Sequence, residues 1–302
     1  MSELRIALLG CGIWGGKILG HLLDLAIDVV VVEPDPSRSD VARAAGAAVA
    51  TVDALGTVDG VIVASPATAH AADLAAVLPL GVPVFCEKPF TTSVADAHRA
   101  AELGGERIHL MHIWRYHPGI ELLGEIARSG ELGSPLGLRS TRANWTSPRT
   151  DTDPVWTLAP HDLTIAIEVL GVAPTPRAAV AELHGGRPVG LWGQLGGGDE
   201  PFLVVENSTR FADKRREVRL HCSDGVAVLP GLDTDSIEIA AGHDATPLMS
   251  RRAFGAAEPL RRELVAFLEH LRGGPPPKSD VHEGVAVVEA VAELRRLAGV
   301  AP

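Results

Sequence analysis

Short apolar runs alternate with amphipathic stretches along the N-terminal third of the chain. The apolar runs are rich in Val, Ile and Leu and span residues 5–9, 29–32, 60–64, 82–86 and 108–111. The stretches between them, at 17–25, 41–45, 69–77 and 94–103, have the composition and spacing of helices. Apolar strands separated by helices are typical of a parallel sheet that is covered on both faces. The pattern therefore predicts an α/β, doubly wound parallel sheet.

The periodicity changes after residue 117. A helix is predicted at 120–129, a strand at 136–145, a loop at 147–154, and a helix that begins near His161 and ends at Leu170. Strand-like runs follow at 177–183, 190–195, 202–211, 216–222, 226–229 and 236–240, and two helices at 259–272 and 282–297 close the chain. Runs at this spacing are typical of an antiparallel sheet. We expect two domains, residues 1–117 and residues 118–302, the second an α+β domain on an open, mostly antiparallel sheet.

A glycine-rich segment directly follows the first predicted strand and opens the first predicted helix. Its glycines, Gly10, Gly12 and Gly15, have the G-x-G-x-x-G spacing, with Ile13 and Trp14 between them. In this context the glycines allow a tight turn, close approach of a pyrophosphate and close packing of helix on strand. The segment predicts a dinucleotide-binding site in a Rossmann domain; the alternative is an ordinary glycine-rich turn.

Glu33 ends the second predicted strand. An acid at this place binds the ribose hydroxyls of NAD and repels the 2′-phosphate of NADP. Ser37 and Arg38 follow and could instead hold that phosphate. The prediction is NAD, with NADP possible.

Two further strand ends carry polar residues. Ser65 and Pro66 end the third long strand, with His70 beyond them, and Glu87 and Lys88 end the next. The carboxyl ends of parallel strands line the ligand crevice of a doubly wound sheet. We therefore expect these five residues near the cofactor, with Lys88 where nicotinamide and substrate meet. Proline after this lysine is consistent with a cis turn.

Composition narrows the class of protein. The chain has 302 residues, 46% of them hydrophobic, and a net charge of −11, which argues against a nucleic-acid surface. Its three cysteines form no CxxC pair, and no group of His, Cys and Asp has metal-ligand spacing, so no metal is expected. The apolar runs are too short to cross a bilayer, and the N-terminus does not read as a signal peptide. We expect a cytoplasmic protein without membrane partners.

Several segments, taken in order, resemble the Gfo/Idh/MocA family of dehydrogenases. They are IALLGCGIWG, VIVASPATAHAADLA, GVPVFCEKPF, HIWRYHPGIELL and VWTLAPHDLTIAIEVLG. The resemblance implies an N-terminal Rossmann domain and a C-terminal domain for substrate binding and oligomerisation, so a homodimer or homotetramer is expected. It also implies hydride transfer between NAD(P) and a secondary alcohol or ketone of a sugar, nucleotide-sugar or cyclitol.

The same resemblance implies residue roles. Lys88 matches the family lysine that contacts substrate and nicotinamide, and His161 matches the general acid/base. Asp162 is expected to orient His161 or bind a substrate hydroxyl, or else to cap the helix. Tyr116 and Trp156 are candidate substrate contacts, and packing is the alternative for each.

The chain departs from the family at two positions. Thr157 stands where many relatives have an Asp, four residues before the catalytic histidine, and Ala67 stands where many have Asn. Threonine cannot accept a proton or hold charge. A non-catalytic regulatory protein that senses NAD(P) or a sugar on the same fold is therefore the alternative function.

Overall fold

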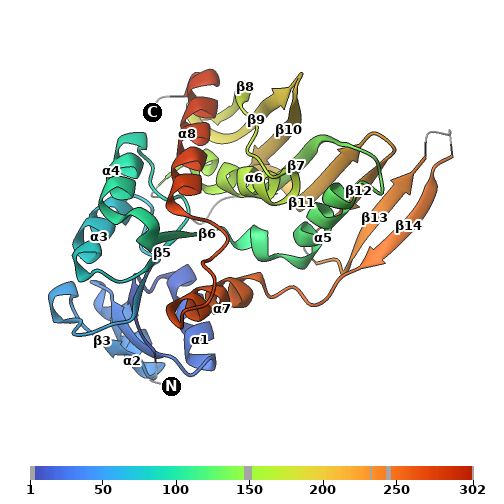
Figure 1. The fold of residues 1–302 in the computed structure, drawn as a ribbon. Helices are drawn as coiled ribbons and strands as arrows, with labels where there is room; N and C mark the ends of the chain where they lie inside the picture. The colour runs from blue at the N-terminus through green and yellow to red at the C-terminus, as the bar shows by residue number, and fades with distance from the viewer. Residues whose placement is uncertain (1–3, 146–151, 232, 243–245, 301–302) are drawn as a thin grey trace. The chain divides into compact units, whose positions relative to one another are not determined.

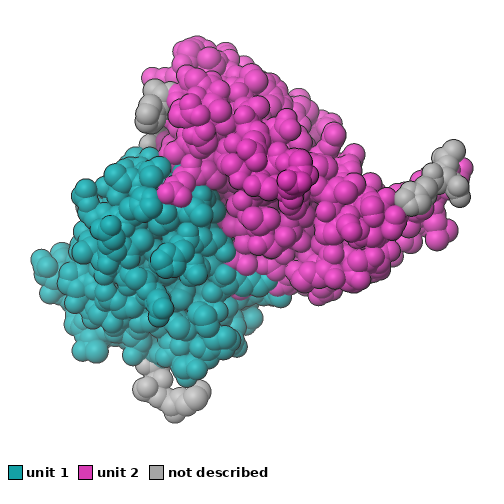
Figure 2. All heavy atoms as spheres, turned by 45° about the horizontal axis from the view of Figure 1, so that its top comes forward, with its two compact units in different colours: residues 1–112, 260–288 teal, residues 113–259, 289–302 magenta. Residues whose placement is uncertain are grey.

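The computed structural model describes residues 4–145, 152–231, 233–242 and 246–300. The described residues within 1–112 and 260–288 form one compact unit, and those within 113–259 and 289–302 form a second (Figure 2). Helix α8 (Val281–Leu297) begins in the first unit and ends in the second. The expected functional division at residues 117 and 118 stays a prediction.

The first unit is built on a six-stranded parallel sheet, which confirms the predicted doubly wound fold (Figure 1). The strand order is β3-β2-β1-β4-β5-β6. The strands are β1 (Arg5–Leu9), β2 (Asp28–Val32), β3 (Ala48–Val49), β4 (Gly60–Val63), β5 (Val84–Glu87) and β6 (Ile108–Met111). The helices that alternate with them are α1 (Ile13–Asp24), α2 (Pro36–Ala44), α3 (His70–Val77) and α4 (Val94–Gly104), with short 3-10 turns η1 (Val52–Ala54), η2 (Leu78–Leu80) and η3 (Gly105–Arg107).

The ends of the central strands lie level with one another. Leu9 of β1 pairs with Val32 of β2 and with Val63 of β4, which in turn pairs with Cys86 of β5. β4, β5 and β6 are buried along their whole length. The loops that leave these strand ends therefore start from one edge of the sheet.

Helix α7 (Pro259–Leu271), from the C-terminal part of the chain, packs on this sheet. The ring of Phe267 stacks on Phe85 of β5 with centroids 4.8 Å apart. A Cβ on Gly60 of β4 would lie 2.8 Å from the side chain of Leu271, so the helix packs closely on the strand. Buried apolar contacts of this kind place α7 in the first unit.

The second unit is built on an eight-stranded, mostly antiparallel sheet, as predicted. Its order is β14-β13-β12-β11-β7-β10-β9-β8, and only the pair of β7 and β10 is parallel among the described strands. The strands are β7 (Pro135–Trp145), β8 (Pro176–His184), β9 (Arg187–Gly197), β10 (Glu200–Ser208), β11 (Arg210–Cys222), β12 (Gly225–Leu229), β13 (Ser236–Ala241) and β14 (Leu248–Ala253). Turn η4 (Ile113–Tyr116) and helices α5 (Pro118–Ser129) and α6 (Pro154–Leu170) complete the unit, with α5 packed on β11, β12 and β13, and α6 on β7, β9 and β10.

Two strand predictions in this unit were wrong. The run predicted as one strand at 202–211 is divided after Ser208, and β11 begins at Arg210, earlier than the predicted 216. The side chain of Thr209 bonds to the carbonyl of Val189 at 2.8 Å in the gap between the strands. β14 was missed because its residues are mostly exposed and show little alternation.

No helix in the described parts of the chain is both long and apolar enough to cross a membrane.

Candidate active site

In the glycine loop between β1 and α1, two glycines have no room for a side chain and one does. Gly10 has φ +87°, and a Cβ there would lie 2.7 Å from the backbone of Ser65. A Cβ on Gly15 would lie 2.1 Å from the carbonyl oxygen of Gly10. A Cβ on Gly12 would meet nothing closer than the Arg38 guanidinium, at 3.7 Å. The first and third glycines are thus needed for packing, while the backbone at the second is open to a ligand.

Helix α1 begins directly after this open glycine. Gly12 is its N-cap residue, and no side chain among the described residues caps it. The first backbone N–H groups of a helix lack intrahelical partners, and the helix dipole adds positive potential. Together with the approachable backbone at Gly12, this end of the helix fits a pyrophosphate.

The carboxylate of Glu33 is fixed beside this loop by backbone donors. It accepts hydrogen bonds from the N–H groups of Cys11, at 2.7 Å, and Asp35, at 3.0 Å. Asp35 in turn caps α2, where its carboxylate accepts from Ser37 Oγ at 2.5 Å and from the backbone N–H of Arg38 at 3.1 Å. Two carboxylates therefore stand at the end of β2, and the Ser37 hydroxyl is engaged by one of them.

His70 connects the loops that follow β4 and β5. Its ring is fully buried, with Nδ1 2.8 Å from the carbonyl oxygen of Pro89 and Nε2 3.0 Å from that of Ser65. The Ser65 hydroxyl donates to Asp73 in the first turn of α3. These contacts fix the two predicted strand-end segments relative to one another.

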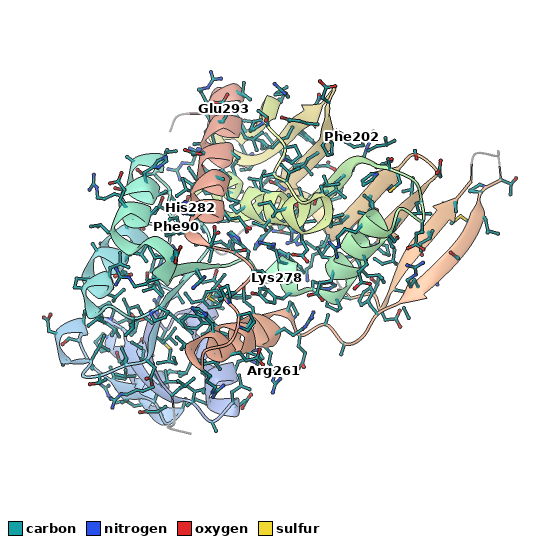
Figure 3. All side chains as sticks on the ribbon, viewed as in Figure 1. Phe90, Phe202, Arg261, Lys278, His282 and Glu293 are labelled. Carbon is teal, nitrogen blue, oxygen red and sulfur yellow. The ribbon has the colours of Figure 1, made fainter. Side chains whose placement is uncertain are left out.

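Glu87 joins the lysine-bearing turn to the glycine loop. Its carboxylate accepts hydrogen bonds from the indole Nε1 of Trp14 and from the backbone N–H of Lys88, the latter at 3.0 Å. Only 3% of Glu87 is exposed. The peptide bond between Lys88 and Pro89 is cis. Phe90, which follows, is buried (Figure 3).

Helix α6 carries His161 in its interior, so the predicted helix start near this residue was wrong. The helix begins at Pro154 and is capped by Asp153, whose carboxylate accepts from the N–H groups of Val155, at 3.0 Å, and Trp156, at 3.4 Å. Aspartate followed by proline is a strong start signal. The proline inside the helix, Pro160, misled the prediction because it normally marks a boundary.

Asp162 does not cap the helix; it lies buried against the sheet of the second unit. Its carboxylate accepts from Asn207 Nδ2 at 2.7 Å, from the Ser140 hydroxyl, and from Arg142 Nε at 3.3 Å. Arg142 is itself only 3% exposed, and burial lowers the pKa of its guanidinium while Asp162 opposes the shift. The pair is a buried ion pair with additional hydrogen bonds.

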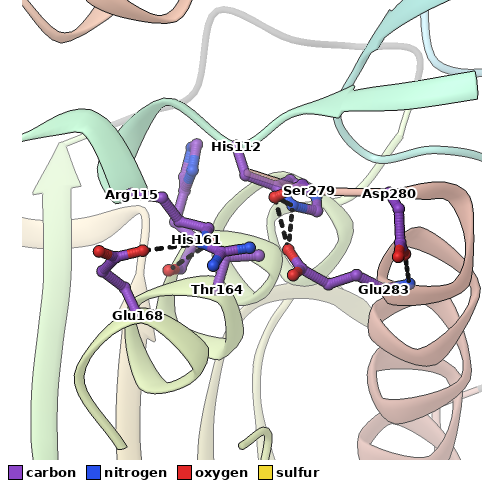
Figure 4. A network of polar contacts seen from close by, with 8 residues as sticks. All are labelled: His112, Arg115, His161, Thr164, Glu168, Ser279, Asp280 and Glu283. Atoms are coloured by element: carbon purple, nitrogen blue, oxygen red, sulfur yellow. Dashed lines mark hydrogen bonds and ion pairs between the residues drawn. The ribbon is translucent and has the colours of Figure 1, made fainter. Parts of the chain in front are cut away.

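His161 lies beside the aromatic ring of Trp114. The two ring centroids are 6.0 Å apart and the planes are inclined by 85°. The carbonyl of His161 accepts a hydrogen bond from Thr164 Oγ1 at 3.1 Å. Glu168, further along α6, pairs with Arg115 of η4 at 3.0 Å (Figure 4). The imidazole of His161 therefore lies between α6 and η4 in the second unit, against the indole of Trp114.

Comparison with known proteins decides the family of the N-terminal part. A family model described as an oxidoreductase family with an NAD-binding Rossmann fold matches residues 4–111. Residues 4–111 belong to the Gfo/Idh/MocA oxidoreductase family.

Individual relatives agree with this assignment. Inositol 2-dehydrogenase 2 of Mycolicibacterium vanbaalenii is 34% identical over 158 residues, which cover 48% of this chain and 46% of the relative. The rhizopine catabolism protein MocA of Rhizobium meliloti is 27% identical over 143 residues, or 44% of this chain and 45% of that protein. The chain thus spans about half the length of the curated relatives it matches.

Solved structures share the whole fold. UDP-N-acetylglucosamine 3-dehydrogenase from Acidithiobacillus ferrooxidans superposes with a TM-score of 0.85 at 23% identity, covering 98% of both chains. A levoglucosan dehydrogenase, solved with NADH and levoglucosan, has a TM-score of 0.85 at 16% identity and covers 99% of this chain and 98% of its own. At these identities the likeness concerns the fold alone.

The residues predicted for the site fall into two sets. The first unit holds the candidates for cofactor binding, and it brings Trp14 to Glu87 and His70 to Ser65. The second unit holds Tyr116, Trp156, His161 and Asp162. Tyr116 and Trp156 are 6% and 5% exposed, and Trp156 lies under the guanidinium of Arg295 at 5.6 Å.

Sequence reasoning missed one buried acid. Glu263 of α7 is fully buried, and neither carboxylate oxygen has a hydrogen-bond partner among the described residues. Burial, and then the nearby charge of Glu87, raise the pKa of Glu263 well above its usual value. The signal was present, since Glu263 lies at helical spacing between Leu260 and Phe267 on the apolar face of α7.

Proposed function

We propose that this chain is an NAD-dependent dehydrogenase that acts on a secondary alcohol or ketone. The observation that carries the proposal is the glycine loop, closed by packing at Gly10 and Gly15 and open at Gly12, before a helix end without a side-chain cap. A loop of this kind on a Rossmann sheet is suited to a dinucleotide. The family match over residues 4–111 supports the same reading.

NAD is the proposed cofactor in preference to NADP. The 2′-phosphate of NADP would meet the carboxylate of Glu33, which two backbone N–H groups fix in place. Asp35 adds a second negative charge, against the single guanidinium of Arg38. Ile13, Trp14, Ser65, Pro66, His70 and Glu87 are the further residues proposed to surround the cofactor. When bound, the nicotinamide would supply or accept the hydride.

Lys88 and His161 are the proposed catalytic pair. The imidazole of His161 would take the proton of the substrate hydroxyl in oxidation and return it in reduction. The ammonium of Lys88 would stabilise the negative charge that develops on the same oxygen. Tyr116 and Trp156 are proposed to shape the substrate region by packing, since both are buried. Asp162 is proposed to act indirectly, because its carboxylate is already bonded within the sheet.

A sugar, nucleotide-sugar or cyclitol is the proposed substrate class. The names of the relatives point to such polyols: an inositol 2-dehydrogenase by sequence, and a UDP-N-acetylglucosamine dehydrogenase and a levoglucosan dehydrogenase by fold. A homodimer or homotetramer is proposed as well. Val180 and its register partner Trp192 on neighbouring strands are 64% and 45% exposed, an apolar surface suited to a second copy.

The test measures cofactor binding and turnover with the full chain. We expect NADH to bind more tightly than NADPH by titration calorimetry, and Lys88→Ala and His161→Ala to lower kcat by about 100-fold or more while NADH still binds. Lys214→Ala and His184→Ala, on exposed residues of the second unit, are the controls and keep wild-type kcat.

Two outcomes contradict the proposal. Absence of binding for both cofactors rejects the dinucleotide site. Cofactor binding without turnover of any cyclitol, sugar or nucleotide-sugar in a panel favours the regulatory alternative.

A further inference from the structure

The position one turn before His161 on α6 is occupied by Thr157. Residues four apart lie on the same face of a helix, so this is where a side chain could orient the imidazole. The Thr157 hydroxyl donates to the carbonyl of Pro154 at 3.1 Å. A hydroxyl can form a hydrogen bond but cannot hold a charge opposite an imidazolium. Other neighbours of His161 therefore matter for its orientation.

Trp114 supplies a rigid wall next to the imidazole. It lies in turn η4, distant from His161 in sequence, and η4 packs on α6. The rings meet edge to face, with centroids 6.0 Å apart and an interplanar angle of 85°. This is a favoured geometry for two aromatic rings.

Trp114 is itself held by a buried guanidinium. The Cζ of Arg142 lies over the indole ring, 5.0 Å from its centroid. Arg142 is 3% exposed, so this cation–π contact is shielded from water and strengthened. The ring of His117 lies against the same indole, with centroids 5.6 Å apart.

Arg142 is anchored by the residue that follows His161. Its Nε donates to Asp162 at 3.3 Å, and Asp162 is fixed further by Asn207 at 2.7 Å and by Ser140. The contacts form a closed ring that runs from His161 along the chain to Asp162, then to Arg142, Trp114 and back to His161. All of its members lie in the second unit.

We propose that Asp162, Arg142 and Trp114 form a brace that positions His161 for proton transfer. The three are positioning residues, and the inference rests on the proposed catalytic role of His161. A buried ion pair with additional hydrogen bonds is rigid, so it restricts the position of the indole above it. The imidazole edge against that indole is then restricted without an acid at position 157.

The test compares variants of the full chain. Trp114→Leu removes the wall, Trp114→Phe keeps an aromatic ring, and Arg142→Lys keeps a charge for Asp162 without the planar group that stacks on the indole. Trp145→Leu is the matched control, since it removes another tryptophan in the second unit that stacks with a guanidinium, that of Arg210 at 4.6 Å. Trp145 is 57% exposed.

Turnover and one NMR signal are measured. Trp114→Leu should lower kcat by about 10- to 100-fold, with KM and the NADH Kd within about 2-fold of wild type. Trp114→Phe should restore most of the activity, Arg142→Lys should be intermediate, and Trp145→Leu should match wild type. The Cε1–H signal of His161, assigned by its loss in His161→Gln, should shift or broaden in Arg142→Lys, which keeps the indole and its ring current, and not in Trp145→Leu.

The NMR signal decides, because it needs no substrate. An unchanged His161 signal in folded Arg142→Lys overturns the brace, whatever the activity. If Arg142→Lys does not fold, wild-type kcat in folded Trp114→Leu overturns it. Failure of the wild-type chain to bind NADH or turn over any polyol would instead contradict the proposed function.

Discussion

At the scale of single residues, the buried carboxyl group of Glu263 lowers the stability of the folded protein. Its carboxyl group is fully buried without a hydrogen-bond partner among the described residues, and burial followed by Glu87 raises its pKa well above the usual value. A carboxyl whose pKa is higher in the folded than in the unfolded state lowers the free energy of unfolding as pH rises above about 4.5. Buried groups of this kind are frequent near functional sites.

Glu263→Gln should therefore stabilise the protein at pH 8 and leave its stability nearly unchanged at pH 4.5. The neutral amide does not ionise in the unfolded chain, so it removes the loss of stability that the raised pKa of Glu263 causes, and the expected gain at pH 8 is about 1–3 kcal/mol. Urea unfolding at both pH values measures it. Glu269→Gln, on an exposed residue of the same helix, is the control. An equal effect of Glu263→Gln at both pH values would show that the carboxyl is not titrating as described.

Residue identities alone predicted part of the candidate site, and its roles stay predictions. A local sequence rule predicted each of three features: the glycine spacing, the acid Glu33 and the Glu87–Lys88 pair at a strand end. Trp114 and Arg142 were not, since their contacts with His161 and Asp162 join residues far apart in sequence. A buried ion pair formed by such residues has no local pattern.

At the scale of elements, strand and helix periodicity predicted nearly every element of the first unit. The errors lie where a local rule was overridden by packing. Pro160 lies inside α6 although proline usually ends a helix, and Thr209 separates two strands that read as one run. α7 was predicted as a helix, but its amphipathic pattern does not specify the packing partner, so the stacking of Phe267 on Phe85 of β5 was not predicted.

The contact between β6 and α7 predicts a response to acid. His109 of β6 is buried, its ring lies 4.8 Å from that of His270 of α7, and neither ring nitrogen has a partner among the described residues. Burial and then His270 lower the pKa of His109 to about 4, opposed by Asp280. Since the unfolded chain takes up this proton near pH 6.5, His109 costs stability as pH falls from 6.5 to 4.

His109→Leu should make the free energy of unfolding less dependent on pH in this range. The wild-type protein should lose up to about 3 kcal/mol more than the variant between pH 7 and pH 4. Chemical unfolding at several pH values measures the difference. His282→Gln, on an exposed histidine of α8 (Figure 3), is expected to follow the wild-type curve. Parallel curves for His109→Leu and wild type would exclude His109 as the source.

At the scale of the whole molecule, the chain contains a parallel sheet with a glycine loop in its first unit and an eight-stranded, mostly antiparallel sheet in its second unit. The sheet order and the family match over residues 4–111 agree on the dinucleotide fold. The sequence pattern could predict both sheets because each has its own periodicity. It could not predict that the C-terminal segment would contribute residues 260–288 to the first unit.

The most direct measurement is the NADH dissociation constant of wild type, Gly12→Ala and Gly20→Ala. A Cβ meets nothing within 4 Å at Gly20 and only the Arg38 guanidinium, at 3.7 Å, at Gly12, so both variants should fold. We predict that Gly12→Ala weakens NADH binding by about 10-fold or more, because its methyl group occupies the approach to the loop backbone, while Gly20→Ala binds as wild type. Equal NADH affinity in all three proteins would contradict the central claim.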